Sequence, residues 1–303
     1  MSKLKNLKML ITDKGFRIYY FSRRGHYKGM DDEKYLRLVY KSKMKRELNL
    51  DNPKTFNEKL QWLKLYDRKP EYTRMVDKYE AKLYVAEKIG EEHIIKNYGV
   101  WDNFDDIDFD KLPDRFVLKC THDCGGLVIC RDKSKLDLAA ARKKINKSLK
   151  VNYFYSGREW PYKDVKPRII AEEYMEDGQD CVGLMDYKFY CFGGEPKFLY
   201  ISKGLETHAT ASISFVNLDW TRAKYERSDY KPFDVLPEKP GAFDEMIEIC
   251  KKLSAGTSFL RVDLYEIMGK VYFSELTFSP CSGFMPFRDP AHDRELGEMI
   301  DLK

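Results

Sequence analysis

The sequence is poor in the patterns that metal sites, disulfide frameworks and membrane spans require. It contains only five histidines, and its seven cysteines include no CxxC pair. These counts argue against a zinc centre and against a disulfide-stapled secreted domain. No apolar run approaches the ~18 residues of a membrane-spanning helix. Asp13, Lys14 and Arg17 interrupt the first apolar stretches, so we expect no signal peptide and a cytoplasmic chain with reduced thiols.

Charge is unevenly distributed along a chain that is otherwise typical of a folded protein. The 303 residues are 43% hydrophobic, which is enough for one large or two ordinary domains. Residues 1–50 hold 14 Lys and Arg against 5 Asp and Glu, so this region carries +9 and the rest of the chain is net negative. Such a region can meet an anionic membrane face, nucleic acid or an acidic glycan, although any single lysine is usually solvated helical surface.

The most informative stretch runs from Arg261 to Pro280 and predicts a β-hairpin. Apolar and polar residues alternate on both sides of a turn at 268–270. Alternation puts Arg261 and Asp263 on one face, and Glu275 and Thr277 on one face of the returning strand. Because paired side chains on neighbouring strands lie roughly 5 Å apart, these groups should converge. Carboxylates, a hydroxyl and a guanidinium together suit one or two hard cations that carry a polyphosphate.

Shorter patterns predict the elements around this hairpin. Helices are expected at 33–48, 78–89, 137–150, 243–253 and 293–302. A further helix is expected to begin at Thr55, which can form a capping box with Glu58. Short strands are expected near 94–95 and 99–101, and further strands at 116–121, 127–130, 168–175, 185–192, 197–201 and 211–216. Residues 152–167 are expected to form a loop or flap. The acidic run 105–110 contains DxD spacings, but it precedes a proline and is more typical of a solvated helical turn.

Two lysines in strands strengthen the prediction of a phosphate site. Lys119 precedes the Gly125–Gly126 loop, whose backbone N–H groups can approach phosphate closely. Lys188 lies between aromatic residues in a predicted strand, where a charge is expected to face a cleft. Like charges about 4 Å apart cost roughly 4 kcal/mol at an effective dielectric near 20, so phosphoryl transfer needs several converging cations.

In these residues the sequence resembles the ATP-grasp superfamily, in which two α+β subdomains with antiparallel sheets clamp ATP. The motif 116–119 with its glycine loop resembles the family's phosphate lysine and flexible loop, and 77–82 resembles its lysine-bearing helix start. Segment 169–175 resembles the hinge strand, and R-x-D at 261–263 with E-x-T at 275–277 resembles the metal motifs, where Thr277 replaces the usual Asn. The resemblance implies ATP contacts at Lys78, Lys119, Gly125, Gly126, Glu172, Glu173, Tyr174, Met175, Asp180 and Lys188.

The resemblance also implies individual roles for these residues. Glu172 would bind the adenine amino group, the backbone of 173–175 would line the base, and Asp180 would take the ribose hydroxyls. Arg261 and Lys188 would be catalytic by neutralising the transferring phosphoryl group. Magnesium, as one or two ions, would bind Asp263, Glu275 and Thr277, where the threonine hydroxyl takes the place of the usual amide.

Three further stretches resemble, more closely, the teichuronopeptide-biosynthesis-like branch of ATP-grasp proteins. They are 52–62, 186–194 and 275–283, and the resemblance covers roughly 50–302. It implies an α+β ATP-grasp fold with a basic helical region at 1–70, a small subdomain at 71–170 and a large subdomain with the metal site at 171–303. Members occur with bacterial surface-polysaccharide genes and are often labelled glycosyltransferases.

The fold so implied favours an ATP-dependent carboxylate–amine ligase that forms an amide through an acylphosphate. Its expected substrates are an amino acid, peptide or other amine, and an anionic, uronic-acid-containing polysaccharide or glycan-lipid precursor of the cell surface or capsule. We expect peripheral contact with the inner membrane face and no nucleic acid partner. The alternatives are a glycan kinase, with His122, Asp123 or His208 as base, a nucleotide-sugar glycosyltransferase, and a binding protein with a degenerate site. For acceptor recognition, the basic region, the flap 153–162, and Arg288 with Asp293 are all candidates.

Overall fold

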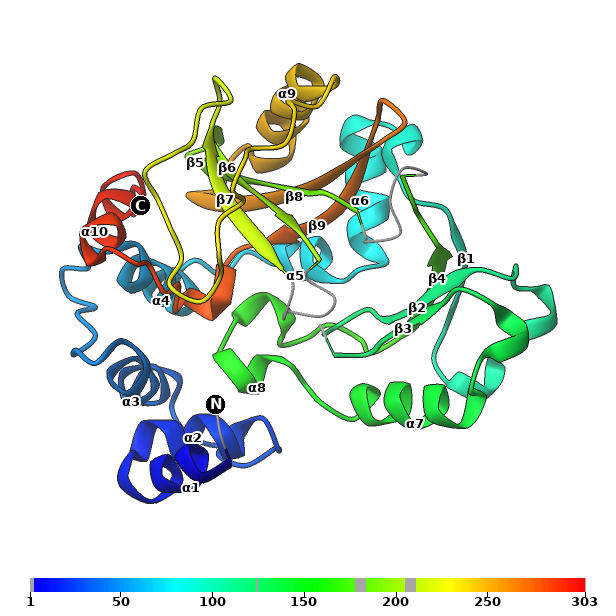
Figure 1. The fold of residues 1–303 in the computed structure, drawn as a ribbon. Helices are drawn as coiled ribbons and strands as arrows, with labels where there is room; N and C mark the ends of the chain where they lie inside the picture. The colour runs from blue at the N-terminus through cyan, green and yellow to red at the C-terminus, as the bar shows by residue number, and fades with distance from the viewer. Residues whose placement is uncertain (1–2, 124, 178–183, 205–210, 303) are drawn as a thin grey trace.

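The computed structural model describes residues 3–123, 125–177, 184–204 and 211–302, and it contains two antiparallel sheets (Figure 1). The four-stranded sheet has the order β1–β4–β2–β3, and the five-stranded sheet has the order β7–β6–β5–β8–β9. The strands of the first are β1 Asn97–Trp101, β2 Phe116–Cys120, β3 Leu127–Cys130 and β4 Ile169–Glu173. Those of the second are β5 Asp186–Phe192, β6 Glu195–Lys203, β7 Ser212–Asn217, β8 Phe259–Ile267 and β9 Lys270–Thr277.

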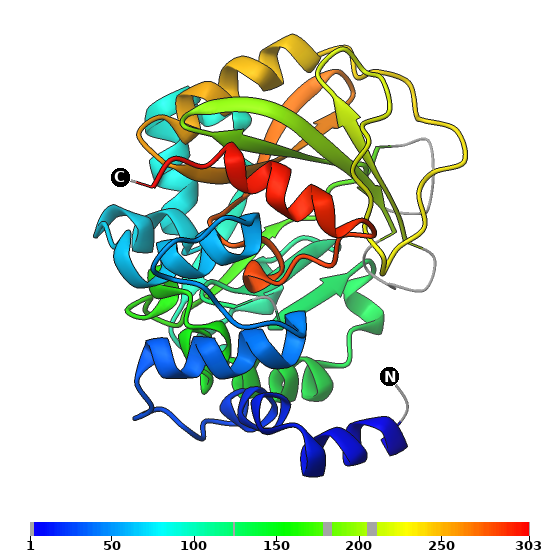
Figure 2. The same cartoon turned by 90° about the vertical axis from the view of Figure 1, so that its left-hand side faces the viewer.

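Helices cover both faces of the five-stranded sheet. On one face the core joins β5 and β8 to α5 Glu71–Val76, α6 Glu80–Ile89 and α9 Phe243–Ser254. On the other face the core joins β5, β6 and β7 to α4 Phe56–Tyr66 and α10 Pro290–Glu298, which lie across the sheet in Figure 2. Side chains along β5 alternate between these faces, since Phe189 belongs to the first core and Tyr190 to the second. Lys188 shares the face of Tyr190, which is where the polar residues of β8 and β9 gather.

The β8–β9 hairpin has the predicted alternation and turn. Met268 and Gly269 form a two-residue turn in which both have positive φ, 51° and 77°. The pairing sets Arg261 opposite Thr277 and Asp263 opposite Glu275, and it shifts register directly after Asp263. This bulge gives β9 one extra residue beside the charged pair, a device that commonly re-aims side chains near a site.

The four-stranded sheet packs on α7 Leu138–Leu149, which lies beneath it in Figure 1. Asp137 caps this helix by accepting from the Ala140 N–H, as the sequence predicts. The acidic run 105–110 forms two short 3₁₀ turns, in agreement with the helical-turn interpretation.

The N-terminal region is helical, as expected, and it contacts the rest of the chain. Its helices are α1 Lys3–Thr12, α2 Lys14–Ser22 and α3 Asp32–Met44, which ends at left-handed Lys45. A small core of this region includes Phe284 from beyond β9, and the Tyr35 hydroxyl donates to the Ser156 carbonyl at 2.8 Å. No helix among the described residues is long and apolar enough to cross a membrane.

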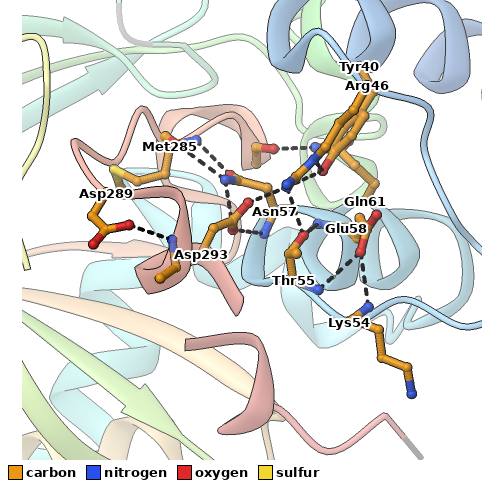
Figure 3. Close-up of polar contacts among 12 residues, drawn as sticks. Tyr40, Arg46, Lys54, Thr55, Asn57, Glu58, Gln61, Met285, Asp289 and Asp293 are labelled. Carbon is orange, nitrogen blue, oxygen red and sulfur yellow. Dashed lines mark hydrogen bonds and ion pairs between the residues drawn. The ribbon is translucent and has the colours of Figure 1, made fainter. Parts of the chain in front are cut away.

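Helix α4 is joined to α10 by a buried polar network (Figure 3). Thr55 and Glu58 form the predicted capping box. Asn57 donates to Asp293 from both its backbone and its side chain at 2.9 Å, and its side chain also binds the Met285 backbone. Arg46 closes the network on Asp293. Asp293, a candidate for acceptor recognition, therefore has structural partners, and exposed Arg288 pairs with Glu226 at 2.6 Å.

Some expected boundaries differ from the structure. The last helix begins at Pro290 and ends at Glu298, because Asp289, not a later residue, caps it by accepting from the Ala291 N–H. The helix expected from residue 78 begins at Glu80, with Asp77 still accepting from the Glu80 N–H. The expected flap at 152–167 contains α8 Phe154–Gly157 and a 3₁₀ turn, η5 Trp160–Tyr162. The subdomain limits at 70 and 170 remain predictions; β4 lies across the second, and α5 and α6 pack on the five-stranded sheet.

Candidate active site

Three buried charges meet on neighbouring strands β5 and β8. The Arg261 guanidinium donates to both carboxylate oxygens of Asp263 at 2.7 Å, and Lys188 Nζ donates to the same carboxylate at 2.8 Å. Asp263 is fully buried, and the two cations are less than a tenth exposed. Lys188 also reaches Asp186 at 3.1 Å. The two catalytic residues predicted from the sequence therefore lie side by side, held by one carboxylate.

The charges in this cluster stabilise one another against burial. Burial by itself would raise the pKa of Asp263, but Arg261 and Lys188 outweigh it and hold that pKa below its ordinary value. Burial would likewise lower the pKa of Lys188, whereas Asp186 and Asp263 raise it well above the ordinary lysine value. Arg261, Lys188 and Asp263 are therefore charged at neutral pH, and the guanidinium and the ammonium are the groups of this cluster that suit a phosphoryl group.

Glu275 and Thr277 border the cluster on β9. The Arg261 guanidinium donates to the Thr277 hydroxyl at 3.0 Å and lies 4.0 Å from the Glu275 carboxylate. Glu275 is about a third exposed and also lies 3.8 Å from Lys78 Nζ. These are hard oxygen donors of the kind magnesium prefers. They fit a cation that binds at Glu275, because both carboxylate oxygens of Asp263 already accept hydrogen bonds from Arg261 and Lys188.

Over the described ranges no three His, Cys, Asp or Glu side chains cluster closely enough to hold a metal ion by themselves. A cation beside Glu275 would therefore complete its shell with phosphate oxygens, as magnesium commonly does in phosphoryl-transfer sites. The metal roles of Asp263, Glu275 and Thr277 stay predictions.

Glu172 faces the site from the four-stranded sheet, where two lysines hold its buried carboxylate. Lys82 Nζ lies 3.0 Å from one oxygen, and Lys119 Nζ pairs with the other. Burial by itself would raise the pKa of Glu172, but these ammonium groups outweigh it and lower the pKa to about 2. The adenine-binding role implied for Glu172 stays a prediction, and in this structure its carboxylate fixes the position of Lys119.

Lys82 is a residue of the site that sequence reasoning missed. Its ammonium also donates to the Ile95 carbonyl at 2.6 Å, and burial lowers its pKa. The available signal was its spacing, because Lys82 follows Lys78 by four residues, which would place both on one face of the helix that the sequence predicts from residue 78, although the observed helix begins at Glu80. The Lys78 ammonium donates to the Asp123 carbonyl at 2.6 Å.

The glycine loop is closed by Asp123 in this conformation. The Gly126 N–H donates to the Asp123 carboxylate at 3.0 Å, so it is not directed at a phosphate here. A Cβ on Gly126 would lie 2.3 Å from Cys120 Sγ. Close packing against Cys120 therefore leaves no room for a side chain at this position. A Cβ on Gly125 would meet nothing nearer than 3.4 Å. The phosphate-binding role of both glycines stays a prediction.

The hinge residues lie at the end of β4. The Glu173 N–H donates to the Lys96 carbonyl at 2.9 Å, and its side chain is exposed. The Tyr174 hydroxyl accepts from Arg131 at 3.0 Å, and the Arg115 guanidinium lies 4.5 Å from its ring centre. Met175 follows at intermediate exposure, and Asp180 lies outside the described residues.

Two cavities meet at the predicted site. The first, of about 180 Å³, lies between the sheets and is lined by residues that include Lys119 and Glu172. The second, of about 330 Å³, is lined by residues that include Arg261, Thr277 and Glu159. Lys78, Asp123 and Glu275 line both. The first cavity is thus lined by four of the predicted nucleotide residues, Lys78, Lys119, Gly126 and Glu172. The second is lined by Arg261, and Lys188 and Asp263 lie behind it as hydrogen-bonded neighbours that line neither cavity.

Two antiparallel sheets that face a lysine-lined cavity, with an acidic and cationic cluster at one end, define a nucleotide-clamping protein with the ATP-grasp fold. A family model described as TupA-like ATPgrasp matches residues 58–301, and the chain therefore belongs to this family. Membership supports an ATP-dependent ligase in general terms and names no substrate. No curated protein matches the sequence significantly.

Solved structures of ATP-grasp ligases are also similar to the chain. A D-alanine–D-alanine ligase from Helicobacter pylori is 16% identical, with 81% of this chain and 69% of that one covered and a TM-score of 0.43. A D-alanine–D-alanine ligase from Bacillus anthracis, complexed with ATP, is 15% identical over 68% and 55%, with a TM-score of 0.40. PsnB, an ATP-grasp ligase complexed with a precursor variant, Mg and ADP, is 10% identical over 73% and 57%, with a TM-score of 0.38.

Proposed function

We propose that the protein is an ATP-dependent carboxylate–amine ligase that forms an amide through an acylphosphate. The substrates we propose are an amino acid or peptide as the amine, and a uronic-acid-containing surface or capsular polysaccharide precursor as the carboxylate. The observation that carries the proposal is the cluster of Lys188, Arg261 and Asp263, which lies beside Glu275, where the two cavities meet.

The arrangement suits the electrostatic problem of the first step. A carboxylate and a phosphoryl group are both negative and repel each other. The protein must therefore place positive side chains beside both groups and keep those side chains ionised. Asp263 holds Arg261 and Lys188 in place, because its carboxylate accepts hydrogen bonds from both. When bound, Mg·ATP supplies the phosphoryl group that activates the carboxylate. Glu275, whose side chain is about a third exposed, would hold the magnesium ion, and the ammonium groups of Lys119 and Lys78 would contact phosphate oxygens.

Several observations support the ligase over two of its alternatives, the glycan kinase and the glycosyltransferase. His122, a candidate base for a glycan kinase, directs Nε2 at the carbonyls of Ser148 and Val151, at 3.2 and 3.0 Å. Asp123 pairs with Ser148 and Gly126, and His208 lies outside the described residues. The acidic run 105–110, on which a glycosyltransferase interpretation depends, lines neither cavity.

The proposal includes peripheral contact of the N-terminal region with an anionic membrane face. Leu7 and Ile11, one helical turn apart on α1, are 60% and 71% exposed in a region that carries +9. Apolar side chains next to basic ones favour binding at the surface of an anionic bilayer.

ADP release tests the ligase directly. With Mg·ATP, uronic-acid oligosaccharides and a panel of amino acids, we expect release that requires both a carboxylate and an amine. Glu275→Gln should lower the rate of ADP release at least about 100-fold, because the carboxylate proposed to hold the magnesium ion is lost. Asp263→Asn should do the same, since Arg261 and Lys188 lose their shared partner. Glu238→Gln, an exposed carboxylate that lines neither cavity, is the control. Unchanged turnover in both site variants would contradict the proposal.

A further inference from the structure

The second cavity contains a carboxylate that the first reaction step does not use. Glu159 belongs to the segment between α8 and η5, lines this cavity with Arg261 and Glu275, and is only 6% exposed. It contacts the Ser282 hydroxyl on the opposite wall. The cavity thus has a third acidic group beyond Asp123, which is bound to Ser148 and Gly126, and Glu275, which faces Lys78.

A buried lysine stabilises the charge of Glu159 without occupying its oxygens. Lys64, from α4, is 3% exposed, and its ammonium has three N–H donors. Those donors are directed at the Ser282 carbonyl at 2.6 Å, the Gly157 carbonyl at 2.9 Å and the Gln61 side chain at 3.0 Å. Lys64 therefore acts on Glu159 through the electric field of its positive charge, and the Glu159 carboxylate can still accept hydrogen bonds from a molecule in the cavity.

The walls that hold Glu159 are unusually constrained. Cys281 and Ser282 both adopt left-handed backbone, with φ of 51° and 57°, a conformation that is strained for residues other than glycine. That conformation turns the Ser282 carbonyl toward Lys64 and Gln61. A Cβ on Gly157 would lie 2.1 Å from Ser282 Oγ, so the two walls touch at this point. Strain retained at a cavity wall is typical of a functional position.

We propose, on the basis of the ligase function above, that Glu159 binds the ammonium group of the amine substrate and takes one of its protons. A protonated amine has no lone pair for attack, so it must lose a proton before it can react with an acylphosphate. Glu159 accepts that proton. The amine nitrogen then forms a bond to the acyl carbon, the bond from carbon to the phosphate oxygen breaks, and the second N–H proton leaves with inorganic phosphate.

The surroundings of Glu159 suit a proton acceptor. Burial raises the pKa of Glu159 above the ordinary glutamate value, and Lys64 opposes that shift. Burial lowers the pKa of Lys64 to about 8. Glu275 and Arg261, one of each sign, also act on the charge of Glu159, and Lys78 and Asp123, again one of each sign, line the same cavity. A carboxylate with a raised pKa is a better base than a solvated one.

The test separates the two half-reactions in the full-length protein. Hydroxylamine is neutral at pH 7 and traps acylphosphate as a hydroxamate without help from a base. With Mg·ATP, uronic-acid oligosaccharide and hydroxylamine, Glu159→Gln should form hydroxamate within about twofold of the wild-type rate. With the amino acid that supports turnover, amide formation at pH 7 should fall about 100-fold, the usual scale of general-base catalysis. The deficit should shrink as the pH rises toward the pKa of the amine.

Two further variants keep the result interpretable. Glu159→Asp retains a carboxylate and should recover part of the amide rate, whereas Glu238→Gln should match the wild type in both assays. Equal loss of hydroxamate and amide in Glu159→Gln, or normal amide formation, would overturn this inference and leave the ligase assignment standing. Absence of hydroxamate in the wild type with every carboxylate tested would instead overturn the ligase function on which the inference rests.

Discussion

Glu172 shows how single residues of this site balance burial against charge. Its carboxylate is 4% exposed, yet Lys82 and Lys119 keep it ionised. A lone buried carboxylate would protonate, and Lys82, which is 7% exposed, would be an unpaired buried ammonium without Glu172. The three groups therefore depend on one another, and Lys119 owes its position to Glu172. The same logic applies to Asp263 with Arg261 and Lys188 across the cavity.

We predict a specific pH dependence for the Glu172 cluster. Because the folded pKa is lowered from 4.5 to about 2, the cluster stabilises the fold above pH 4.5 and loses that stability as the pH falls toward 2. The shift corresponds to about 3 kcal/mol at pH 7, and Glu172→Gln should lower the free energy of unfolding by that order in urea denaturation. At pH 3 the difference between wild type and variant should be about half as large.

The neighbouring Glu173→Gln variant is the matched control for this prediction. Glu173 is exposed, so its unfolding free energy should change by less than about 0.5 kcal/mol at either pH. An equal loss for Glu172→Gln at pH 7 and pH 3 would show that packing, and not ionisation, accounts for its contribution.

At the scale of elements, the β8–β9 hairpin is the part of the site that the sequence predicts best. Alternation fixes which side chains share a face, and strand pairing then brings Arg261 and Asp263 against Thr277 and Glu275. Sequence reasoning did not find the bulge after Asp263, because an extra residue in one strand leaves the pattern of alternation nearly intact.

The turn of this hairpin offers a stabilising substitution. Met268 has φ of 51° and is 88% exposed, so it bears left-handed strain without packing in return. Met268→Asn creates the Asn-Gly pair that two-residue turns of this kind favour. We expect about 1 kcal/mol of added stability, measured as a thermal midpoint roughly 2 °C higher. Met268→Ala removes side-chain bulk without easing the strain, and an equal gain there would contradict the explanation.

Helix α4 shows where sequence reasoning fell short. Its start and capping box were predicted correctly, and Phe56 and Leu60 on its apolar face are fully buried. Its second buried face is polar, since Asn57, Gln61 and Lys64 hold segment 282–285. Periodicity identifies apolar stripes, but the partners of a buried polar stripe lie some 220 residues away and only the tertiary structure reveals them. Glu159 escaped prediction for the same reason.

At the scale of the whole molecule, the N-terminal region is attached to the wall of the second cavity. Arg158 precedes Glu159, is 1% exposed and pairs with Asp32 of α3 at 3.0 Å. Its guanidinium also donates to the Tyr27 carbonyl at 2.9 Å and lies 4.3 Å from the Tyr35 ring centre. The basic region therefore does more than carry charge, because it helps to position the segment that contains Glu159.

Arg158→Met should loosen this attachment while leaving the nucleotide side intact. We expect faster hydrogen exchange in α2 and α3, together with a several-fold higher KM for the amine substrate. The KM for ATP should stay within about twofold, because Arg158 lines neither cavity. Arg288→Met removes an exposed arginine pair elsewhere and is the control. A higher KM for ATP alone would show that Arg158 acts on the nucleotide and not on the cavity wall.

The mass of the product tests the central claim most directly. The protein would be incubated with Mg·ATP, uronic-acid oligosaccharide and each amino acid, and the products analysed by mass spectrometry alongside ADP. Ligation predicts one ADP per product, and a product lighter by one water than the sum of the oligosaccharide and the amino acid. A product heavier than the oligosaccharide by a phosphate group, with no amino acid attached, would contradict the ligase and identify a kinase.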